Sequence, residues 1–382
     1  MKRLVILISS ILILQSSFLS AQPSLDDKVY GLLIGSAIGD AAGGPTEFAP
    51  PERSFWSTTN QKITPQDLDE LGALFKLRDY PRPIEPFGVW ENQPPAGTIT
   101  DDTRLKMIFF DALEASSGKI TEKDMARATL NFGDHLPEKY QAINKEWMKE
   151  IGFASRWALG ERENAYPTER IWGGVPTVMG SMAFLPVAAL YPDNPREAYK
   201  KTYELGYFDN GIAKDINSTI VAGLANALSE GGSWESVIET IRTTDPFNYN
   251  GTLYVNRATT QWLDRALSIA ERADGNIAQL YHLLESELQT TYWWEAWVPL
   301  VVVFAVAEFT EGHPMASMQI ILEFGHDTDS YMQVMGAFLG ALHGSNVFPE
   351  GMIDTVNTQM KTQFGEDVND WMELVEAYRE KK

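Results

Sequence analysis

Residues 31–43 read GLLIGSAIGDAAG, an apolar run with a glycine at every fourth position (Gly31, Gly35, Gly39 and Gly43). Residues 335–344 read MGAFLGALHG and repeat this spacing. Each interior glycine costs a helix about 1 kcal/mol relative to alanine, so a helix that keeps several must gain something from them. Four-residue spacing places the glycines on one face, where another backbone can approach closely. We therefore expect two helices that cross tightly at the centre of the fold.

Most of the remaining chain also has helical periodicity. Asn194-Pro195 is typical of a helix start, with proline at the first helical position. Apolar periodicity predicts helices at residues 212–229, 255–273, 293–310, 327–343 and 366–380. Strand signals are few, and the best of them is the short run at residues 252–255. The sequence therefore predicts an all-α fold in which many helices pack around one core.

Residues 1–21 have the layout of a secretion signal. Lys2 and Arg3 precede an apolar run, and Ser20-Ala21 offers small residues for cleavage. The run is short for a membrane span, although an uncleaved anchor helix is the alternative. We expect a cleaved signal peptide, export to the periplasm or the medium, and no stable membrane insertion afterwards. Residues 22–382 should then form a single helical domain.

The composition excludes several classes of function. The 382 residues include 31 basic and 52 acidic side chains, so the net charge is 31 − 52 = −21. Such a polyanion repels phosphate backbones, which argues against nucleic-acid binding. The chain has no cysteine, which rules out disulfides, thiolate metal sites and a cysteine nucleophile. With only five histidines, a metal site would use mostly oxygen ligands.

Two segments combine paired aspartates with hydroxyl residues at a predicted helix start. Residues 97–103 read GTITDDT, and residues 325–330 read GHDTDS. One aspartate or threonine is enough to cap a helix. Adjacent carboxylates repel one another unless they protonate or share a cation, and oxygen ligands of this kind suit Mg²⁺ or Mn²⁺. The clusters therefore indicate either helix caps or a metal site, with Asp40 and Glu47 as further acidic candidates.

Two segments interrupt the helical pattern. Residues 44–98 are rich in proline and aromatic side chains, and residues 155–178 contain Tyr166-Pro167 and the run IWGGVP at residues 171–176. Long ordered loops in a compact domain often form a binding site. Either the two segments line such a site, or they merely cover the core.

The motifs together resemble the ADP-ribosylglycohydrolase family, which includes the dinitrogenase-reductase-activating glycohydrolases. Residues 31–48, 100–103 and 325–344 occur in the family's order and span nearly the whole mature chain. The resemblance implies an all-α orthogonal multi-helix bundle with two Mg²⁺ or Mn²⁺ ions in a central cleft. It implies metal ligands on two sides of the cleft: Thr100, Asp101 and Asp102 on one, and Asp327, Asp329 and Ser330 on the other. Glu47 matches the family's mobile acidic residue near the metals.

The resemblance also implies hydrolysis at the anomeric carbon of a ribose, through an oxocarbenium-like transition state. Two cations would orient the ribose hydroxyls and lower the pKa of a bound water. Either Asp102 or Glu47 would act as general base, and the sequence does not choose between them. We expect a small-molecule or ADP-ribosylated substrate and a monomeric protein.

Some positions depart from the family pattern. Ser330 replaces a threonine, and His326 replaces a glycine or asparagine. Three roles are open for His326: substrate contact, metal ligation, or a structural role in which it caps the helix start or packs against Phe324. The family's middle motif is only dimly visible at residues 180–186, and residues 207–210 read YFDN in place of a Thr-His pair. Two alternatives therefore remain, an exported glycohydrolase for another N- or O-glycoside and a non-catalytic binding or structural protein.

Overall fold

The computed structural model describes residues 22–49, 52–81, 93–116, 118–135, 141, 145, 148–288 and 290–381. The predicted signal peptide, residues 1–21, lies outside this part of the chain. The described α-helices are α1 (Leu25–Gly43), α2 (Phe55–Thr58), α3 (Pro65–Gly72), α4 (Asp101–Ala115), α5 (Glu122–His135), α7 (Lys149–Ala158), α8 (Met179–Phe184), α9 (Val187–Leu190), α10 (Pro195–Leu205), α11 (Ala213–Ala227), α12 (Trp234–Thr243), α13 (Ala258–Ala273), α14 (Ile277–Leu288), α15 (Trp297–Phe309), α16 (Pro314–Phe324), α17 (Thr328–His343), α18 (Glu350–Phe364) and α19 (Val368–Glu380).

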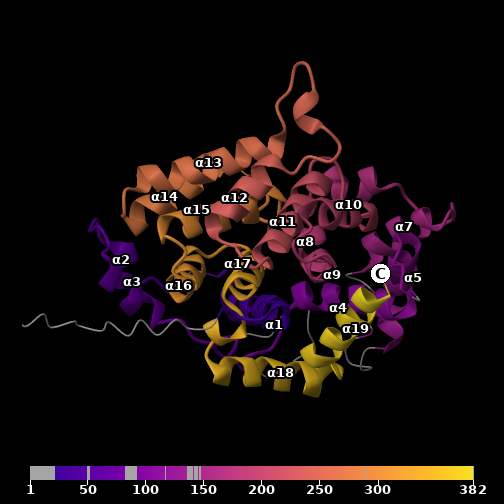
Figure 1. Cartoon of the computed structure of the whole chain (residues 1–382), viewed down its shortest axis with the longest axis horizontal. Helices are drawn as coiled ribbons and strands as arrows, with labels where there is room; N and C mark the ends of the chain where they lie inside the picture. The colour runs from indigo at the N-terminus through magenta and orange to yellow at the C-terminus, as the bar shows by residue number, and fades with distance from the viewer. Residues whose placement is uncertain are drawn as a thin grey trace, which may run out of the picture.

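The two glycine-rich segments form α1 and α17, which lie side by side at the centre of the molecule (Figure 1). Their backbones are in direct contact along the whole crossing. A Cβ atom added to Gly31 would lie 2.6 Å from the carbonyl oxygen of Gly340, and one added to Gly43 would lie 2.5 Å from Cα of Asp329. The pairing runs antiparallel, so the end of α1 meets the start of α17. The predicted tight crossing is confirmed.

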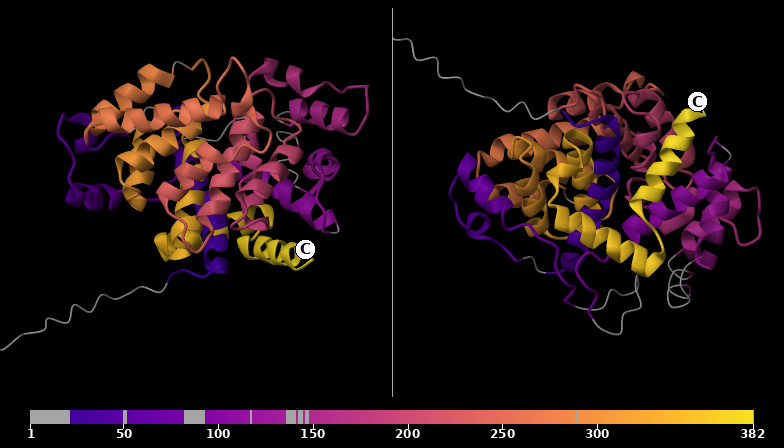
Figure 2. Two further views of the ribbon diagram at one scale, coloured as in Figure 1. Left: turned by 45° about the horizontal axis from the view of Figure 1, so that its top comes forward. Right: turned by 60° about the horizontal axis from the view of Figure 1, so that its bottom comes forward.

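The other helices pack around this pair. The α13 and α14 helices lie along one edge of the bundle, and α18 and α19 lie along the opposite edge (Figures 1 and 2). The buried α15 helix packs between α13 and the central α17. The Trp262 ring of α13 stacks on the Trp297 ring of α15, with centroids 5.4 Å apart. Trp371 of α19 stacks on Phe110 of α4 in the same way, at 4.5 Å. The result is the all-α architecture that the sequence predicts.

The predicted helix interiors are confirmed, but two of their starts are wrong. Helix α13 begins at Ala258 rather than near residue 255, and α15 begins at Trp297 rather than near residue 293. The run at residues 252–255 is an exposed loop and not a strand. Within the described residues, the one extended pairing is an isolated bridge between Thr177 and Glu295. None of the described helices combines the length and apolar character needed to cross a membrane.

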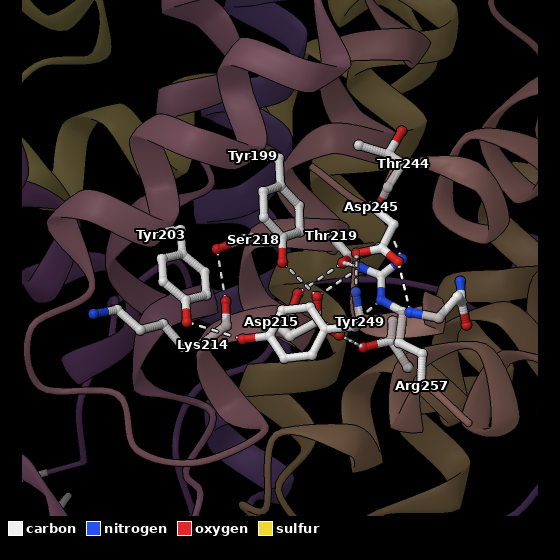
Figure 3. A network of polar contacts seen from close by, with 12 residues as sticks. Tyr199, Tyr203, Lys214, Asp215, Ser218, Thr219, Thr244, Asp245, Tyr249 and Arg257 are labelled. Atoms are coloured by element: carbon white, nitrogen blue, oxygen red, sulfur yellow. Dashed lines mark hydrogen bonds and ion pairs between the residues drawn. The ribbon is translucent and has the colours of Figure 1, made fainter. Parts of the chain in front are cut away.

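A buried ion pair fixes the loop before α13. Arg257 donates to Asp215 of α11 through Nε at 2.8 Å and through Nη2 at 2.6 Å, and its Nη1 donates to the Thr244 carbonyl at 2.8 Å. Tyr199 and Thr259 also donate to the Asp215 carboxylate, each at 2.5 Å. Figure 3 shows this network between α10, α11 and the loop. The Asp215 carboxylate accepts four hydrogen bonds, and every guanidinium nitrogen of Arg257 donates at least one, so this buried charge pair is a structural anchor.

Candidate functional site

The start of α4 is held by a carboxylate from α1. Asp40 accepts hydrogen bonds from the backbone N–H groups of Thr100 and Thr103, each at 3.1 Å. These two N–H groups lie at the helix start, where no intrahelical partner exists, so Asp40 satisfies them from outside. The Thr100 hydroxyl lies 2.6 Å from Asp40 Oδ1 and 2.9 Å from Asp329 Oδ2. Asp40 thereby places the first aspartate cluster against the start of α17.

The two aspartate clusters meet at this point. Carboxylate oxygens of Asp101, Asp102 and Asp329 lie within 4.8 Å of one another. Oxygens of Glu47, Asp327 and Asp329 form a second group by the same measure. The antiparallel crossing explains this meeting, because it brings the start of α17 to the end of α1 and the turn that follows it. Asp329 belongs to both groups.

Burial and mutual repulsion disfavour the charged forms of these carboxylates. Burial raises the pKa of Asp101 to about 6, against an opposing effect of Arg104. Burial also raises the pKa of Asp327 to about 7. The pKa values of Asp102 and Asp329 are raised well above the ordinary range, first by burial and then by the neighbouring carboxylates. Such a group is costly to keep ionised unless a cation neutralises it.

The donor set fits a hard divalent cation. It consists of carboxylate oxygens, and the Oδ2 atom of Asp327 is buried without a hydrogen-bond partner. A buried carboxylate oxygen that lacks a donor is unusual and calls for an explanation, such as an ion. Mg²⁺ and Mn²⁺ prefer oxygen ligands of this type. The predicted ligands all lie where the starts of α4 and α17 meet; they are Thr100, Asp101, Asp102, Asp327, Asp329 and Ser330. Their roles as ligands stay predictions.

Two buried polar residues at the site were missed by the sequence reasoning. Lys106 is fully buried, and its Nζ donates to the Asp102 carbonyl at 3.0 Å and to the Gln333 side chain. Gln333 in turn donates to Asp102 Oδ1, which also accepts from the Ser330 hydroxyl at 3.1 Å. These contacts tie the Asp102 carboxylate to α17. Lys106 follows Asp102 by four residues and directly precedes the apolar run at residues 107–110, and this spacing was the available signal.

A cleft with a volume of about 510 Å³ opens onto the carboxylates. Glu47 and Phe48 of the first predicted loop line it, as do Trp172, Thr177 and Val178 of the second. Its remaining described lining residues are Asp101, Asp102, Lys149, Glu150, Met179, Met182, Trp294, Asp327 and Ser330. The two segments that interrupt the helical pattern, residues 44–98 and 155–178, therefore both contribute to the cleft. This is expected if they line a binding site.

His326 is placed differently from the other candidates. Its ring stacks on Trp293 with centroids 3.6 Å apart and lies edge-on to Phe324 at 5.0 Å. Burial lowers its pKa, although Glu285 opposes this effect. The His326 side chain is not among those that line the cleft. This placement agrees with the alternative that His326 packs against Phe324. Substrate contact by His326 stays a prediction, and no contact of its side chain with the cleft supports it.

Comparisons with known proteins agree with this fold. A relative from Escherichia coli (strain K12), the uncharacterized protein YegU, is 22% identical over 345 residues, which cover 87% of this chain and 93% of the relative. A solved structure titled "ADP-ribosylglycohydrolase-related protein complex" has a TM-score of 0.55 and 17% identity, with 94% of this chain and 98% of that chain covered. The sequence model of the family described as ADP-ribosylglycohydrolase matches residues 21–382. The chain therefore belongs to the ADP-ribosylglycohydrolase family.

Proposed function

We propose that this protein is a metal-dependent glycohydrolase that cleaves the glycosidic bond of ADP-ribosylated or related ribosyl substrates. Its family supports hydrolysis of a glycosidic bond. The observation that carries the proposal is the position of Asp329, whose carboxylate belongs to two groups of acidic residues at one cleft. Two groups that share one carboxylate suit two divalent ions, Mg²⁺ or Mn²⁺.

The reaction needs one water molecule and no redox partner. The bond between the anomeric carbon and the leaving nitrogen or oxygen breaks, and the water oxygen bonds to the anomeric carbon. One water proton ends on the leaving atom, so atoms and charges balance. A bound divalent ion supplies Lewis acidity that holds sugar hydroxyls and favours deprotonation of water. The positive charge that develops on the sugar ring is matched by the acidic surroundings.

Glu47 is the better candidate for the general base. Its side chain lines the cleft and is only half buried, so both water and substrate can reach it. The Asp102 carboxylate also lines the cleft, but its Oδ1 already accepts hydrogen bonds from Ser330 and Gln333. We assign Asp102 to metal binding and Glu47 to accepting the proton from water, which leaves Asp327 and Asp329 as the carboxylates of the second group that would hold an ion.

The site of action in the cell is a separate part of the proposal. The sequence of residues 1–21 supports export by a cleaved signal peptide. An exported enzyme of this class would meet ribosyl compounds outside the cytoplasm, and ADP-ribosylated proteins are chiefly intracellular. Export therefore favours a related ribosyl substrate over an ADP-ribosylated protein.

The test is a substrate panel with and without added Mg²⁺ or Mn²⁺. ADP-ribosyl-arginine, ADP-ribosyl-serine and simple ribosides are incubated with the mature protein, and release of the free sugar is measured. We expect metal-dependent hydrolysis of at least one of them and a loss of about 100-fold or more in Glu47→Gln. The exposed Asp354→Asn variant is the matched control and should retain full activity. Absence of hydrolysis across the panel would favour a non-catalytic binding protein.

A further inference from the structure

The turn that carries Glu47 is held by the segment just before α17. The Phe48 N–H donates a hydrogen bond to the His326 carbonyl at 2.8 Å. This N–H belongs to the peptide unit that joins Glu47 to Phe48, and a peptide unit is planar. The hydrogen bond therefore fixes the direction in which the backbone leaves Glu47, and this direction limits where the Glu47 side chain can point.

Both residues of this hydrogen bond have a left-handed backbone. The φ angle is 47° at Phe48 and 65° at His326. A side chain larger than that of glycine disfavours this conformation, so it persists only where the surrounding contacts hold it. The hydrogen bond therefore depends on contacts that keep the backbone of both residues in this form.

The ring of His326 supplies one of these contacts. It stacks on the Trp293 ring with centroids 3.6 Å apart and an angle of 16° between the ring planes. It also meets Phe324 edge-on at 5.0 Å. Its Nε2 atom lies 4.0 Å from the Glu285 carboxylate, which is beyond hydrogen-bond distance. The face of the His326 ring, rather than its nitrogens, therefore holds the residue in place.

The next residue along the chain, Trp294, supplies the contact for Phe48. The two rings meet edge-on with centroids 6.0 Å apart. The carbonyl of Trp294 accepts a hydrogen bond from the Val178 N–H at 2.9 Å, which anchors this segment to the backbone before α8. Trp293 thus contacts His326, and Trp294 contacts Phe48. We call Phe48, Trp293, Trp294 and His326 the aromatic clasp, because their contacts form a closed circuit beside Glu47.

We propose that His326 is a positioning residue, which stacks on Trp293, keeps the aromatic clasp closed and so holds Glu47 where it takes a proton from water. The inference rests on the proposed function and deepens it, because it assigns a residue that places the general base. His326 is not among the described side chains that line the cleft, so this role needs no contact with substrate or metal. Misplacing a catalytic group by about 1 Å costs up to about 100-fold in rate, so the effect is measurable.

The first test measures the clasp without any substrate. Amide hydrogen exchange at Phe48 is followed by mass spectrometry of overlapping peptic fragments. His326→Ala removes the stacked ring, and Trp293→Leu removes its partner, so we expect each variant to exchange about fivefold to tenfold faster at this amide. His326→Phe keeps a ring face without nitrogens and should exchange at the wild-type rate. His282→Ala, which removes an exposed histidine of α14, is the control and should also match the wild type.

The second test measures catalysis on a glycoside that the substrate panel shows to be cleaved. We expect His326→Ala to lower kcat by about tenfold or more, with little change in KM or in affinity for Mn²⁺. His326→Phe should retain the wild-type kcat. In the Glu47→Gln background, His326→Ala should cause little further loss, since the proton acceptor that it positions is already gone.

The outcomes separate the inference from the proposed function. Faster exchange at Phe48 in His326→Ala and Trp293→Leu, with the wild-type rate in His326→Phe, supports the clasp even if no glycoside is cleaved. Unchanged exchange in His326→Ala overturns the inference, because the ring then does not hold the turn. An equal defect in His326→Phe overturns it too, since a ring nitrogen is then required. A full further loss of kcat in the Glu47→Gln background would show that His326 acts by another route, and it would leave the proposed function intact.

Discussion

At the scale of single residues, Asp329 has a position that no other acidic side chain in the described part of the chain shares. Its carboxylate belongs to both groups of acidic residues, whereas Asp101 belongs to one. If each group holds one ion, Asp329→Asn should weaken both sites, and Asp101→Asn should weaken only one. Elemental analysis after loading and dialysis should give two ions per chain for the wild type, about one for Asp101→Asn and fewer for Asp329→Asn.

Folding and specificity need controls in this experiment. Circular dichroism should show that both variants remain folded, because each replacement keeps the shape of the side chain and removes a costly buried charge. The exposed Asp354→Asn variant should bind as many ions as the wild type. Equal ion content in wild type and Asp329→Asn would contradict the shared role of this residue.

Asp209 gives a pH dependence that is independent of metal. Burial raises its pKa to about 7, so the folded state holds a proton that the unfolded chain releases near pH 4. Stability from this group therefore falls as the pH rises from about 4 to 7 and is constant above that range. At about 1.4 kcal/mol per pKa unit, the loss is on the order of a few kcal/mol.

Asp209→Asn should remove this dependence, since the amide does not titrate. The measurement is urea denaturation of wild type and variant at pH 5 and pH 8. We expect the wild type to lose more free energy of unfolding than the variant between these two pH values. Equal losses in the two proteins would show that Asp209 does not titrate in this window.

Many residues of the candidate site, but not all of them, can be predicted from the sequence. The aspartate clusters could be recognised because each is a local pattern of carboxylates and hydroxyls at a helix start. The four-residue spacing from Asp102 offers a signal for Lys106 alone. Its pairing with Gln333 could not be recognised, because this hydrogen bond joins residues 227 positions apart in the chain. The packing of His326 on Trp293 also depends on the fold, because these residues lie in separate segments.

At the scale of helices, the contact between α1 and α17 depends on the missing side chains of its glycines. A Cβ on Gly31 would lie 2.6 Å from the Gly340 oxygen and 2.8 Å from the carbonyl carbon of Gly344, and neither backbone atom can turn aside. Gly31→Ala should therefore destabilise the protein by about 1–3 kcal/mol. Thermal and urea denaturation measure this difference.

Gly351 of α18 is the matched control for this prediction. A Cβ added there meets no atom within 4 Å, and its backbone does not need a positive φ. Gly351→Ala should be neutral or stabilise by roughly 0.5 kcal/mol, because it reduces the freedom of the unfolded chain. Equal stability of the two variants would mean that the helices can move apart without cost.

Helix interiors were easier to predict than helix ends. Periodicity of apolar residues fixes which segments are helical, because each must bury one face. The starts of α13 and α15 were placed too early because tertiary contacts decide them. Arg257 turns to pair with Asp215, and the residues before Trp297 pair with Thr177 and Val178.

At the scale of the whole molecule, the export prediction concerns residues 1–21. Intact-mass measurement on protein isolated from its native host should give a chain that begins near Gln22. Proteins from the cytoplasmic and exported fractions should be measured side by side, since a precursor would still carry the N-terminal segment. A full-length product confined to the cytoplasm would contradict export and make an intracellular ADP-ribosyl substrate the better candidate.

The antiparallel pairing of α1 with α17 has a consequence for biosynthesis. Thr100 and Asp329, which meet at the site, are 229 residues apart in the chain. The ribosome therefore makes the acidic residues of the N-terminal part, such as Asp101 and Asp102, long before Asp327 and Asp329. A nascent chain that ends before residue 327 carries only the N-terminal acidic residues of the site and lacks α17 altogether. If the site holds ions as proposed, their capture would come after nearly all of the chain has been synthesised. A chain translocated before folding would take its ions from the pool of the receiving compartment, so that pool, rather than the cytoplasm, would decide between magnesium and manganese.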